Sequence, residues 1–285
     1  MQNPAIKVER LTHIYQPYGV VALEDVSFEV GEGEFVAVIG QNGSGKTTLL
    51  KNIVGLLKPT QGRVLVEGLD TRRSTVAELS RWVGLVLQNP DQQLFAQTIE
   101  EEIAFGPRNL NLPDTEVASR VEEAMAMLGL ERFRQEFPLA LSIGDRARVV
   151  IASVLAMRPQ IILLDEPTMG QDYRGHHQIM GVAGQLHGEG HTIVIATHHV
   201  DLVAEYAQRV IVLCGGRILL DDTPAAVFSQ PEVLRRTHIA PPQITQLAQA
   251  LPAYLGLPRD ALTVAELGEA VLEKVKIKRS LPRRS

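Results

Sequence analysis

The chain has 285 residues, of which 45% are hydrophobic and 21% charged, a composition typical of folded globular proteins and unlike disordered or fibrous ones. Its 28 basic and 33 acidic residues give a formal net charge of −5, which argues against nucleic acid as the main partner, because phosphate-backbone binding needs a basic face. The single cysteine excludes an internal disulfide framework and favours a reducing compartment.

Two apolar patterns predict two kinds of strand. From Ile6 to Val30 the apolar residues often alternate with polar ones, which is typical of half-buried antiparallel strands. The runs Phe35–Ile39, Ile161–Leu164 and Thr192–Ala196 are instead continuously apolar, as expected of strands buried on both faces of a parallel sheet. We therefore predict an α/β core with a mixed, mainly parallel sheet and an antiparallel β subdomain.

A glycine-rich loop follows the first continuous strand. Residues 40–47 match G-x-x-x-x-G-K-[ST] between a buried strand and a helix-forming run, which is the pattern of a P-loop NTPase. Such a loop aims main-chain amides at phosphate oxygens from a helix N-terminus. Lys46 is expected at the β/γ-phosphates of ATP, Thr47 at Mg²⁺ and Thr48 near the α-phosphate. The predicted phosphate-binding residues are Gly40, Asn42, Gly43, Ser44, Gly45, Lys46, Thr47 and Thr48.

The gap between the first two continuous strands is too long for one crossover connection, and its middle has helical periodicity. We predict an inserted helical subdomain over about residues 95–158. Within it, Asp114 is expected to cap a helix that follows Pro113 and ends at Gly129. Ser142 is placed to cap a second helical run, Arg146–Met157.

Two acidic residues end the second continuous strand. The run Ile161–Leu164 delivers Asp165 and Glu166 to the carboxyl edge of the sheet, where α/β folds bind ligands. Asp165 fits a carboxylate on the Mg²⁺ side, and Glu166 fits a general base that polarises the attacking water. An acid pair alone would more often cap a helix, but its combination with the phosphate loop favours catalysis.

The sheet core is expected to end after a hairpin at Gly215-Gly216, where both turn positions need positive φ. The predicted domains are therefore residues 1–222, the ATPase core, and residues 223–285, a small helical domain with a basic tail. Helix-like stretches at Ile244–Ala250 and Val264–Lys274 support the second domain.

The segment Ala140–Asp145 resembles the ABC signature motif, Leu-Ser-Gly-Gly-Gln, and lies about twenty residues before the acidic pair. Leu141, Ser142 and Gly144 match this motif, whereas Ile143 replaces a glycine and Asp145 replaces the glutamine. The resemblance implies an ABC ATPase, in which Ser142 and Gly144 of one subunit face the phosphate loop of a second, so that ATP is sandwiched between them. Asp145 would bring a negative charge close to the γ-phosphate.

The same resemblance implies roles for residues outside these motifs. Gln88 resembles the glutamine that approaches Mg²⁺ and water and contacts a transmembrane partner. Tyr15 resembles the aromatic residue that stacks on adenine, with Tyr18 as its competitor. His198 resembles the switch histidine that contacts the γ-phosphate, with His199 as its neighbour. The predicted catalytic residues are Lys46, Gln88, Glu166 and His198, and the predicted Mg²⁺ ligands are Thr47, Gln88 and Asp165.

Three phrases, QNPDQQLFAQTIEEEIAFGP, PTMGQD and PPQITQLAQAL, resemble the energy-coupling factor subfamily, which includes cobalt- and vitamin-importer ATPases. Asp172 in the second phrase resembles the aspartate that crosses the ATPase dimer interface. The subfamily resemblance implies a second ATPase subunit, identical or homologous, a transmembrane coupling protein, and a small membrane protein that captures a vitamin or transition-metal ion. It also implies that the C-terminal helical domain helps the ATPases to dimerise.

Alternatives remain at this level: a soluble ABC ATPase outside transport, such as one for cluster assembly, or an ATPase of another ABC importer class. No apolar stretch reaches the roughly 20 residues that a membrane-spanning helix needs, and the N-terminus lacks a signal-peptide pattern. We therefore expect a peripheral protein at the cytoplasmic face of the cell membrane, with ATP and Mg²⁺ as cofactors and no nucleic acid partner.

Overall fold

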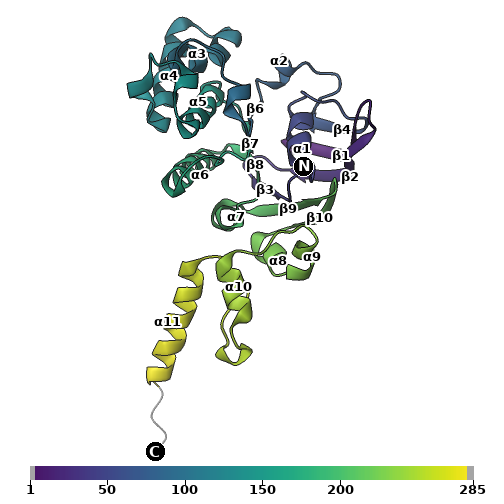
Figure 1. The fold of residues 1–285 in the computed structure, drawn as a ribbon, viewed down its shortest axis with the longest axis vertical. Helices are drawn as coiled ribbons and strands as arrows, with labels where there is room; N and C mark the ends of the chain where they lie inside the picture. Colours follow the sequence, from purple (N-terminus) through teal and green to yellow (C-terminus); the bar gives the residue numbers. More distant parts are fainter. Residues whose placement is uncertain (1–3, 281–285) are drawn as a thin grey trace, which may run out of the picture.

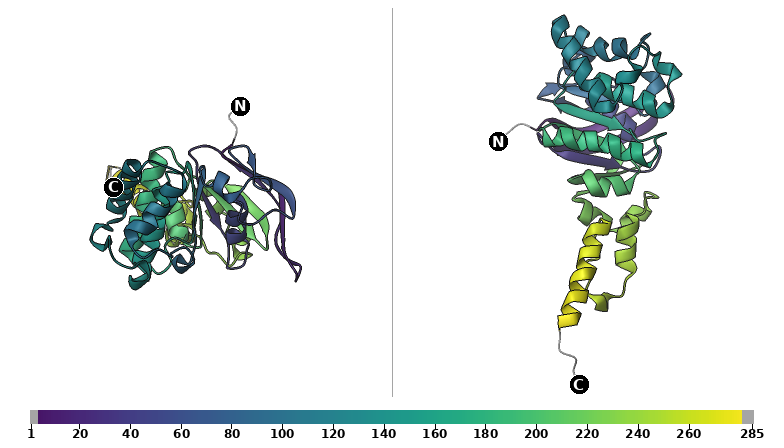
Figure 2. Two further views of the ribbon diagram at one scale, coloured as in Figure 1. Left: turned by 90° about the horizontal axis from the view of Figure 1, so that it is seen from above. Right: turned by 90° about the vertical axis from the view of Figure 1, so that its left-hand side faces the viewer.

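The computed structural model describes the backbone of residues 4–280 and the side chains of residues 4–276. Three parts follow one another along the longest axis of the molecule (Figure 1): a helical subdomain, two packed sheets, and a group of C-terminal helices. The side view in Figure 2 shows the sheets between the two helical parts.

The first sheet is antiparallel and contains four strands in the order β2-β1-β4-β5. The alternating burial along its two long strands confirms the prediction of half-buried antiparallel strands. The strands are β1 (Ile6–Tyr15), β2 (Val20–Val30), β4 (Gln61–Val66) and β5 (Leu69–Asp70).

The second sheet contains six strands in the order β10-β9-β3-β8-β7-β6. The predicted continuous strands are confirmed: β3, β8 and β7 are neighbours, run parallel and are fully buried. Only β10 runs antiparallel, after the predicted hairpin, where Gly215 has φ 53° and Gly216 has φ 76°. The strands are β3 (Phe35–Ile39), β6 (Val83–Val86), β7 (Ile161–Asp165), β8 (Thr192–Thr197), β9 (Arg209–Cys214) and β10 (Arg217–Asp222).

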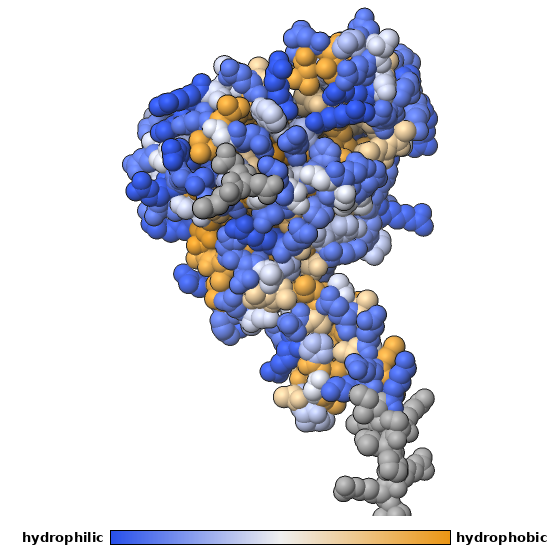
Figure 3. All heavy atoms as spheres, turned by 180° about the vertical axis from the view of Figure 1, so that it is seen from behind, coloured by the Kyte–Doolittle hydropathy of each residue, from blue (hydrophilic) through white to orange (hydrophobic). Residues whose placement is uncertain are grey.

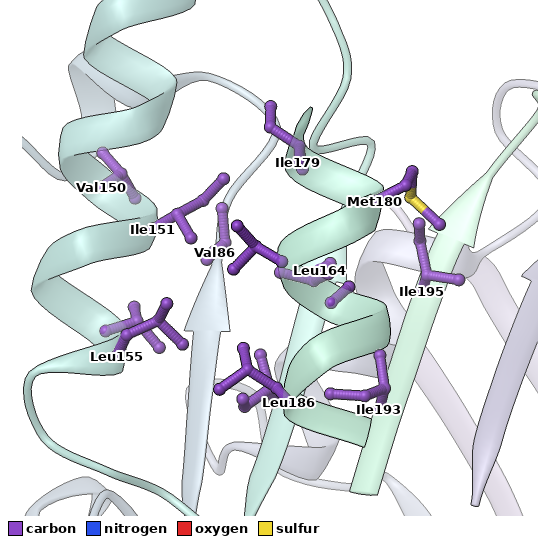
Figure 4. Packing of buried hydrophobic residues seen from close by; sticks show 14 of the residues in the cluster. Val86, Val150, Ile151, Leu155, Leu164, Ile179, Met180, Leu186, Ile193 and Ile195 are labelled. Carbon is purple, nitrogen blue, oxygen red and sulfur yellow. The ribbon is translucent and has the colours of Figure 1, made fainter. Parts of the chain in front are cut away.

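Successive residues of the central strands enter two different hydrophobic clusters. On β3, Phe35 and Ala37 join a cluster with the helices, whereas Val36 and Val38 join a cluster shared with the antiparallel sheet. Figure 4 shows helix α6 (Tyr173–Gly188) packed over the face of the sheet that carries Phe35 and Ala37. Because both faces are covered, only continuously apolar strands suit these positions. Two further core helices are α1 (Lys46–Ile53) and α7 (Val200–Tyr206).

The helical subdomain lies between β6 and β7 in the chain. One detail of the prediction is wrong: Asp114 does not cap its helix but is the first helical residue, and Pro113 holds the cap position without a side-chain bond. Pro113 suits that position because N–H groups at the start of a helix have no acceptor within the helix, so the missing N–H of proline removes no helical hydrogen bond. Gly129, with φ 66°, ends the helix as predicted. The helices are α3 (Ile99–Asn109), α4 (Asp114–Leu128) and α5 (Ile143–Leu155).

Four short elements lie between these strands and helices. The helix α2 (Val76–Leu79) lies between β5 and β6, the 3₁₀ turn η1 (Pro90–Gln92) lies between β6 and α3, and the 3₁₀ turns η2 (Glu131–Phe133) and η3 (Pro138–Ala140) both lie between α4 and α5.

The C-terminal helices have a small core of Ala248, Ala261 and Leu267. Apolar side chains remain exposed on them, among them Leu247 and Leu272, and Figure 3 shows such residues on this part of the surface. The basic tail lies largely outside the described residues. Within residues 4–280, no helix is both long and apolar enough to cross a membrane. The elements are α8 (Pro224–Phe228), α9 (Pro231–Arg235), α10 (Gln243–Ala250), η4 (Ala253–Leu255) and α11 (Val264–Ser280).

Candidate nucleotide site

The phosphate loop joins the end of β3 to the start of α1, so its last amides lie at a helix N-terminus. Two of its glycines have backbone neighbours that leave no room for a side chain. A Cβ on Gly40 would lie 2.3 Å from the carbonyl oxygen of Leu213, and one on Gly45, where φ is 108°, would lie 2.6 Å from that of Ala22. These glycines therefore let the loop pack directly against the strands beside it.

A cleft of about 360 Å³ opens over this loop. Strand β1, strand β2 and the ends of β6 and β7 complete its walls, so the cleft unites segments that are far apart in sequence. Its lining residues are Tyr15, Val20, Val21, Ala22, Asn42, Gly43, Ser44, Gly45, Lys46, Thr47, Thr48, Gln88, Asp165 and Glu166.

Lys46 is buried at the floor of the cleft, with 7% of its surface exposed. Its Nζ donates hydrogen bonds to the carbonyl oxygens of Gly40, at 2.7 Å, and Gln41, at 3.3 Å, and lies 3.8 Å from Glu166 Oε1. Burial lowers the pKa of the Lys46 ammonium, and the charges of Glu166 and Asp165 oppose that shift. The ammonium is thus held next to the loop, where it can meet a phosphate.

Asp165 ends β7 with both carboxylate oxygens buried and without a hydrogen-bond partner in the described protein. Burial raises the pKa of this carboxyl group. Buried polar atoms without partners are rare in native structures, because they lose the hydrogen bonds that water would make. Oxygen ligands are the ones that Mg²⁺ prefers, so a magnesium ion beside Asp165 would satisfy these atoms.

Glu166 has an unusual backbone conformation for a residue with a side chain, with φ 46°. Its Oε2 lies 2.9 Å from Nδ1 of His198 and accepts a hydrogen bond of 3.3 Å from the Thr197 hydroxyl. Its Oε1 is buried, has no hydrogen-bond partner among the described residues, and lies 3.8 Å from Nζ of Lys46. Strain of this kind gathers at functional sites, where surrounding contacts maintain it.

His198 directly follows β8, lies beside the Glu166 carboxylate and is half exposed, with 55% of its side chain accessible. Its ring lies 4.3 Å from that of His199, which does not contact Glu166 through a hydrogen bond. Of the two histidines, only His198 therefore has the geometry expected of the residue that pairs with the general base.

Tyr15 lines the cleft, and its hydroxyl lies 3.1 Å from Oγ1 of Thr48. Tyr18, the competing aromatic residue, is 88% exposed and does not line the cleft. Gln88 also lines it, and its Nε2 donates to Sδ of Met169 at 3.4 Å. Tyr15 and Gln88, which lie on either side of the phosphate loop in the sequence, thus line one cleft with it.

We expect Tyr15→Ala to weaken nucleotide binding by about 0.5–1.5 kcal/mol, or roughly 2- to 12-fold, because the aromatic platform for a base would be lost. Fluorescence titration with an ATP analogue measures this change. Tyr18→Ala is the matched control and should bind like the parent. Equal losses in both variants would contradict the choice of Tyr15.

The residues that resemble the ABC signature lie outside the cleft around the phosphate loop. Ser142 caps α5 and accepts a hydrogen bond of 3.2 Å from the amide of Asp145. Gly144 accepts at its carbonyl oxygen from Nε2 of Gln171 at 2.9 Å, and Asp172 caps α6. Ser142, Gly144 and Asp172 do not line the cleft around the phosphate loop, so one chain does not bring these two groups together.

Residues Val20, Val21 and Ala22 line the cleft but were not predicted from the sequence. They begin β2, and Val20 and Val21 are 57% and 48% exposed, which is unusual for valine in a strand. No local motif marks them, because their place in the site depends on how β2 lies beside the phosphate loop.

Comparisons with known proteins agree with this geometry. A family model described as ABC transporter matches residues 23–169. The energy-coupling factor transporter ATP-binding protein EcfA2 of Clostridium tetani is 44% identical over 255 residues, which cover 87% of this chain and 88% of that protein. The corresponding EcfA of Methanoculleus marisnigri is 46% identical over 247 residues, which cover 86% and 89%.

Two solved structures agree as well. The structure of cbiO1 from Clostridium perfringens, described as part of the ABC transporter complex cbiONQ, has a TM-score of 0.72 and 38% identity, and covers 82% of this chain and 94% of its own. A dimeric ATP-binding cassette, MJ0796, bound to ADP and Pi in a post-hydrolysis state, has a TM-score of 0.70 and 31% identity, with 77% and 98% covered. The chain belongs to the ABC transporter family, and within it to the ATP-binding proteins of energy-coupling factor transporters.

Proposed function

We propose that this ATPase subunit hydrolyses Mg²⁺-ATP to drive uptake of a vitamin or transition-metal ion. It would do so with a transmembrane coupling protein, a substrate-capturing membrane protein and a second ATPase subunit. The observation that carries the proposal is the single cleft that joins Lys46 to Asp165 and Glu166. A phosphate-binding cation and a carboxylate pair at one sheet edge are the parts that phosphoryl transfer to water requires.

Each cleft residue has a distinct task in this proposal. The loop amides and Lys46 bind the β- and γ-phosphates, and Thr48 binds near the α-phosphate. Magnesium would be held by Thr47, Gln88 and Asp165 and would neutralise charge on the phosphates. Tyr15 stacks on the adenine.

The proton transfer falls to residues on β7 and β8. Glu166 takes a proton from the attacking water through its unpartnered Oε1. His198 holds the other oxygen of that carboxylate at 2.9 Å and, from its exposed side, contacts the γ-phosphate. The carboxylate is thereby oriented through one oxygen, while the buried Oε1 keeps its capacity to accept a hydrogen bond from the attacking water.

The signature residues Ser142 and Gly144, with Asp172, would complete the site of a second subunit. Their position outside the chain's own cleft supports this arrangement, and so does the dimeric state of the MJ0796 cassette. The C-terminal helices, with their exposed apolar residues, would add to the contact between the two ATPases.

A second, larger groove offers a place for the transmembrane coupling protein. Its volume is about 720 Å³, and it lies between the core and the helical subdomain next to the segment 88–95. Phe95 and Phe105 stand in it 59% and 48% exposed, with their rings 4.7 Å apart. Exposed aromatic residues of this kind mark protein interfaces, so a helix of the membrane partner would dock here and hold the chain at the cytoplasmic face of the membrane.

Purification of the tagged chain from solubilised membranes tests the proposed function. Membrane proteins should co-purify with it, and the reconstituted complex should take up a vitamin or metal ion only with hydrolysable ATP. Recovery of the chain with soluble partners alone, such as cluster-assembly proteins, would replace transport with the alternative function.

The substitution Gln88→Ala should uncouple transport from hydrolysis. Gln88 stands both in the nucleotide cleft and at the start of the segment beside the apolar groove, so it can relay the state of one to the other. We expect uptake to fall at least about tenfold more than ATP hydrolysis when both are measured in the same proteoliposomes. Unchanged uptake would contradict this role.

A further inference from the structure

The signature of this chain departs from the family pattern at Asp145, and the structure shows what that residue does. Its Oδ2 accepts a hydrogen bond of 2.7 Å from the Ser142 hydroxyl, while its amide donates to the same hydroxyl oxygen. Ser142 thus caps α5 by accepting from the Asp145 amide, and the Asp145 carboxylate accepts in return from the Ser142 hydroxyl. The Asp145 carboxylate therefore helps to fix the start of α5, and it places a negative charge in the first turn of this helix.

That charge opposes the proposed task of the helix end. In the proposed function, the N-terminus of α5 contacts the γ-phosphate of an ATP molecule that is bound to the phosphate loop of another subunit. A carboxylate in the first helical turn stabilises the helix itself. The same carboxylate repels an approaching phosphate, since like charges a few ångströms apart destabilise each other.

Arg148 compensates this charge from one turn further along α5. Its Nη2 forms an ion pair with Oδ1 of Asp145, and both side chains are largely shielded, at 20% and 16% exposed. Its Nη1 donates to the carbonyl oxygen of Leu128, at the end of α4, at 3.2 Å. The guanidinium is therefore anchored between two helices and does not depend on Asp145 alone for its position.

We propose that Arg148 is a positioning residue that acts through Asp145. Its guanidinium pairs with Oδ1 of Asp145 and offsets the charge of this carboxylate, whose Oδ2 is bonded to the Ser142 hydroxyl, so that the Ser142 end of the helix can receive a γ-phosphate. This inference rests on the proposed function, because it concerns the shared ATP site. According to this proposal, the signature segment still acts on ATP despite Asp145, because Arg148 compensates the added negative charge.

A double-mutant cycle tests the proposal on the complex that co-purifies with the tagged chain. Arg148→Met should lower kcat for ATP hydrolysis roughly tenfold, as expected for an uncompensated charge near a phosphate, with KM for ATP little changed. Asp145→Asn in the same chain should restore kcat to within about twofold of the parent, because the charge that Arg148 offsets is then absent. Raising the salt concentration should shrink the deficit of Arg148→Met, since screening weakens repulsion.

The control and the contrary outcomes are equally specific. Arg158→Met removes another arginine ion pair of the helical subdomain, with Glu123, and should leave kcat unchanged. Parental activity of Arg148→Met, or a double variant as slow as Arg148→Met, would overturn the proposal, the second result assigning Arg148 to the contact with Leu128. The proposed function itself predicts that the parent and every variant bind an ATP analogue at the phosphate loop. Titration of the parent therefore distinguishes the two failures: absent binding contradicts the proposed function, whereas normal binding with either kinetic result above contradicts only the role of Arg148.

Discussion

Replacement of Glu166 by glutamine is expected to lower ATP hydrolysis by roughly 10²- to 10⁴-fold, the usual contribution of a general base. Glutamine has nearly the same shape but cannot take a proton from water. Its side chain can still meet His198 and Thr197, which now hold Oε2 of Glu166. Nucleotide binding should therefore persist, because the phosphate loop is untouched. Phosphate release under single-turnover conditions and equilibrium titration measure the two properties separately.

Glu67 provides a matched control for this substitution. It is also a glutamate with positive φ, 48°, but lies outside the cleft, in the turn between β4 and β5. Glu67→Gln should hydrolyse ATP like the parent. If Glu166→Gln were to retain parental hydrolysis, the attacking water would have to be activated by another group, and the role of Glu166 would be lost.

Substitution of Lys46 by alanine should weaken nucleotide binding by about 3 kcal/mol or more, on the order of 100-fold, since charge-assisted hydrogen bonds to phosphate would be lost. In the structure its Nζ is bonded to loop carbonyl oxygens beside the cleft, a position from which it can turn to a phosphate. Hydrolysis at low ATP should fall at least as far. Isothermal titration with ATP and magnesium checks the binding loss.

Lys51, on the same helix α1, is the control for Lys46. It carries the same charge but does not line the cleft, so Lys51→Ala should bind ATP like the parent. Parental binding by Lys46→Ala would refute the assignment of the phosphate loop itself. The Lys46 and Glu166 variants together distinguish binding from chemistry, because the first should lose both and the second only hydrolysis.

The strands and the phosphate loop could be predicted because their signals are local. A strand buried on both faces must be apolar at every position, and β3, β7 and β8 meet this requirement within five or six residues each. The helix that begins at Asp114 could be predicted from its apolar periodicity, which is also a local signal, but the role of Asp114 within it could not. Either Pro113 or Asp114 suits the start of a helix, and their local preferences alone do not separate the two positions.

The sequence by itself determined which residue types could serve phosphate transfer, because the spacing of glycines, Lys46 and the acidic pair is a property of adjacent residues. Only the tertiary structure decided which of them meet. Glu166 and His198 are 32 residues apart, and they come within 2.9 Å because β7 and β8 are neighbours in the sheet. Likewise Val20 and Val21 reach the cleft through the position of β2, which no local pattern encodes. Local spacing sets backbone conformation, whereas strand order and packing of the whole chain set the contacts between distant segments.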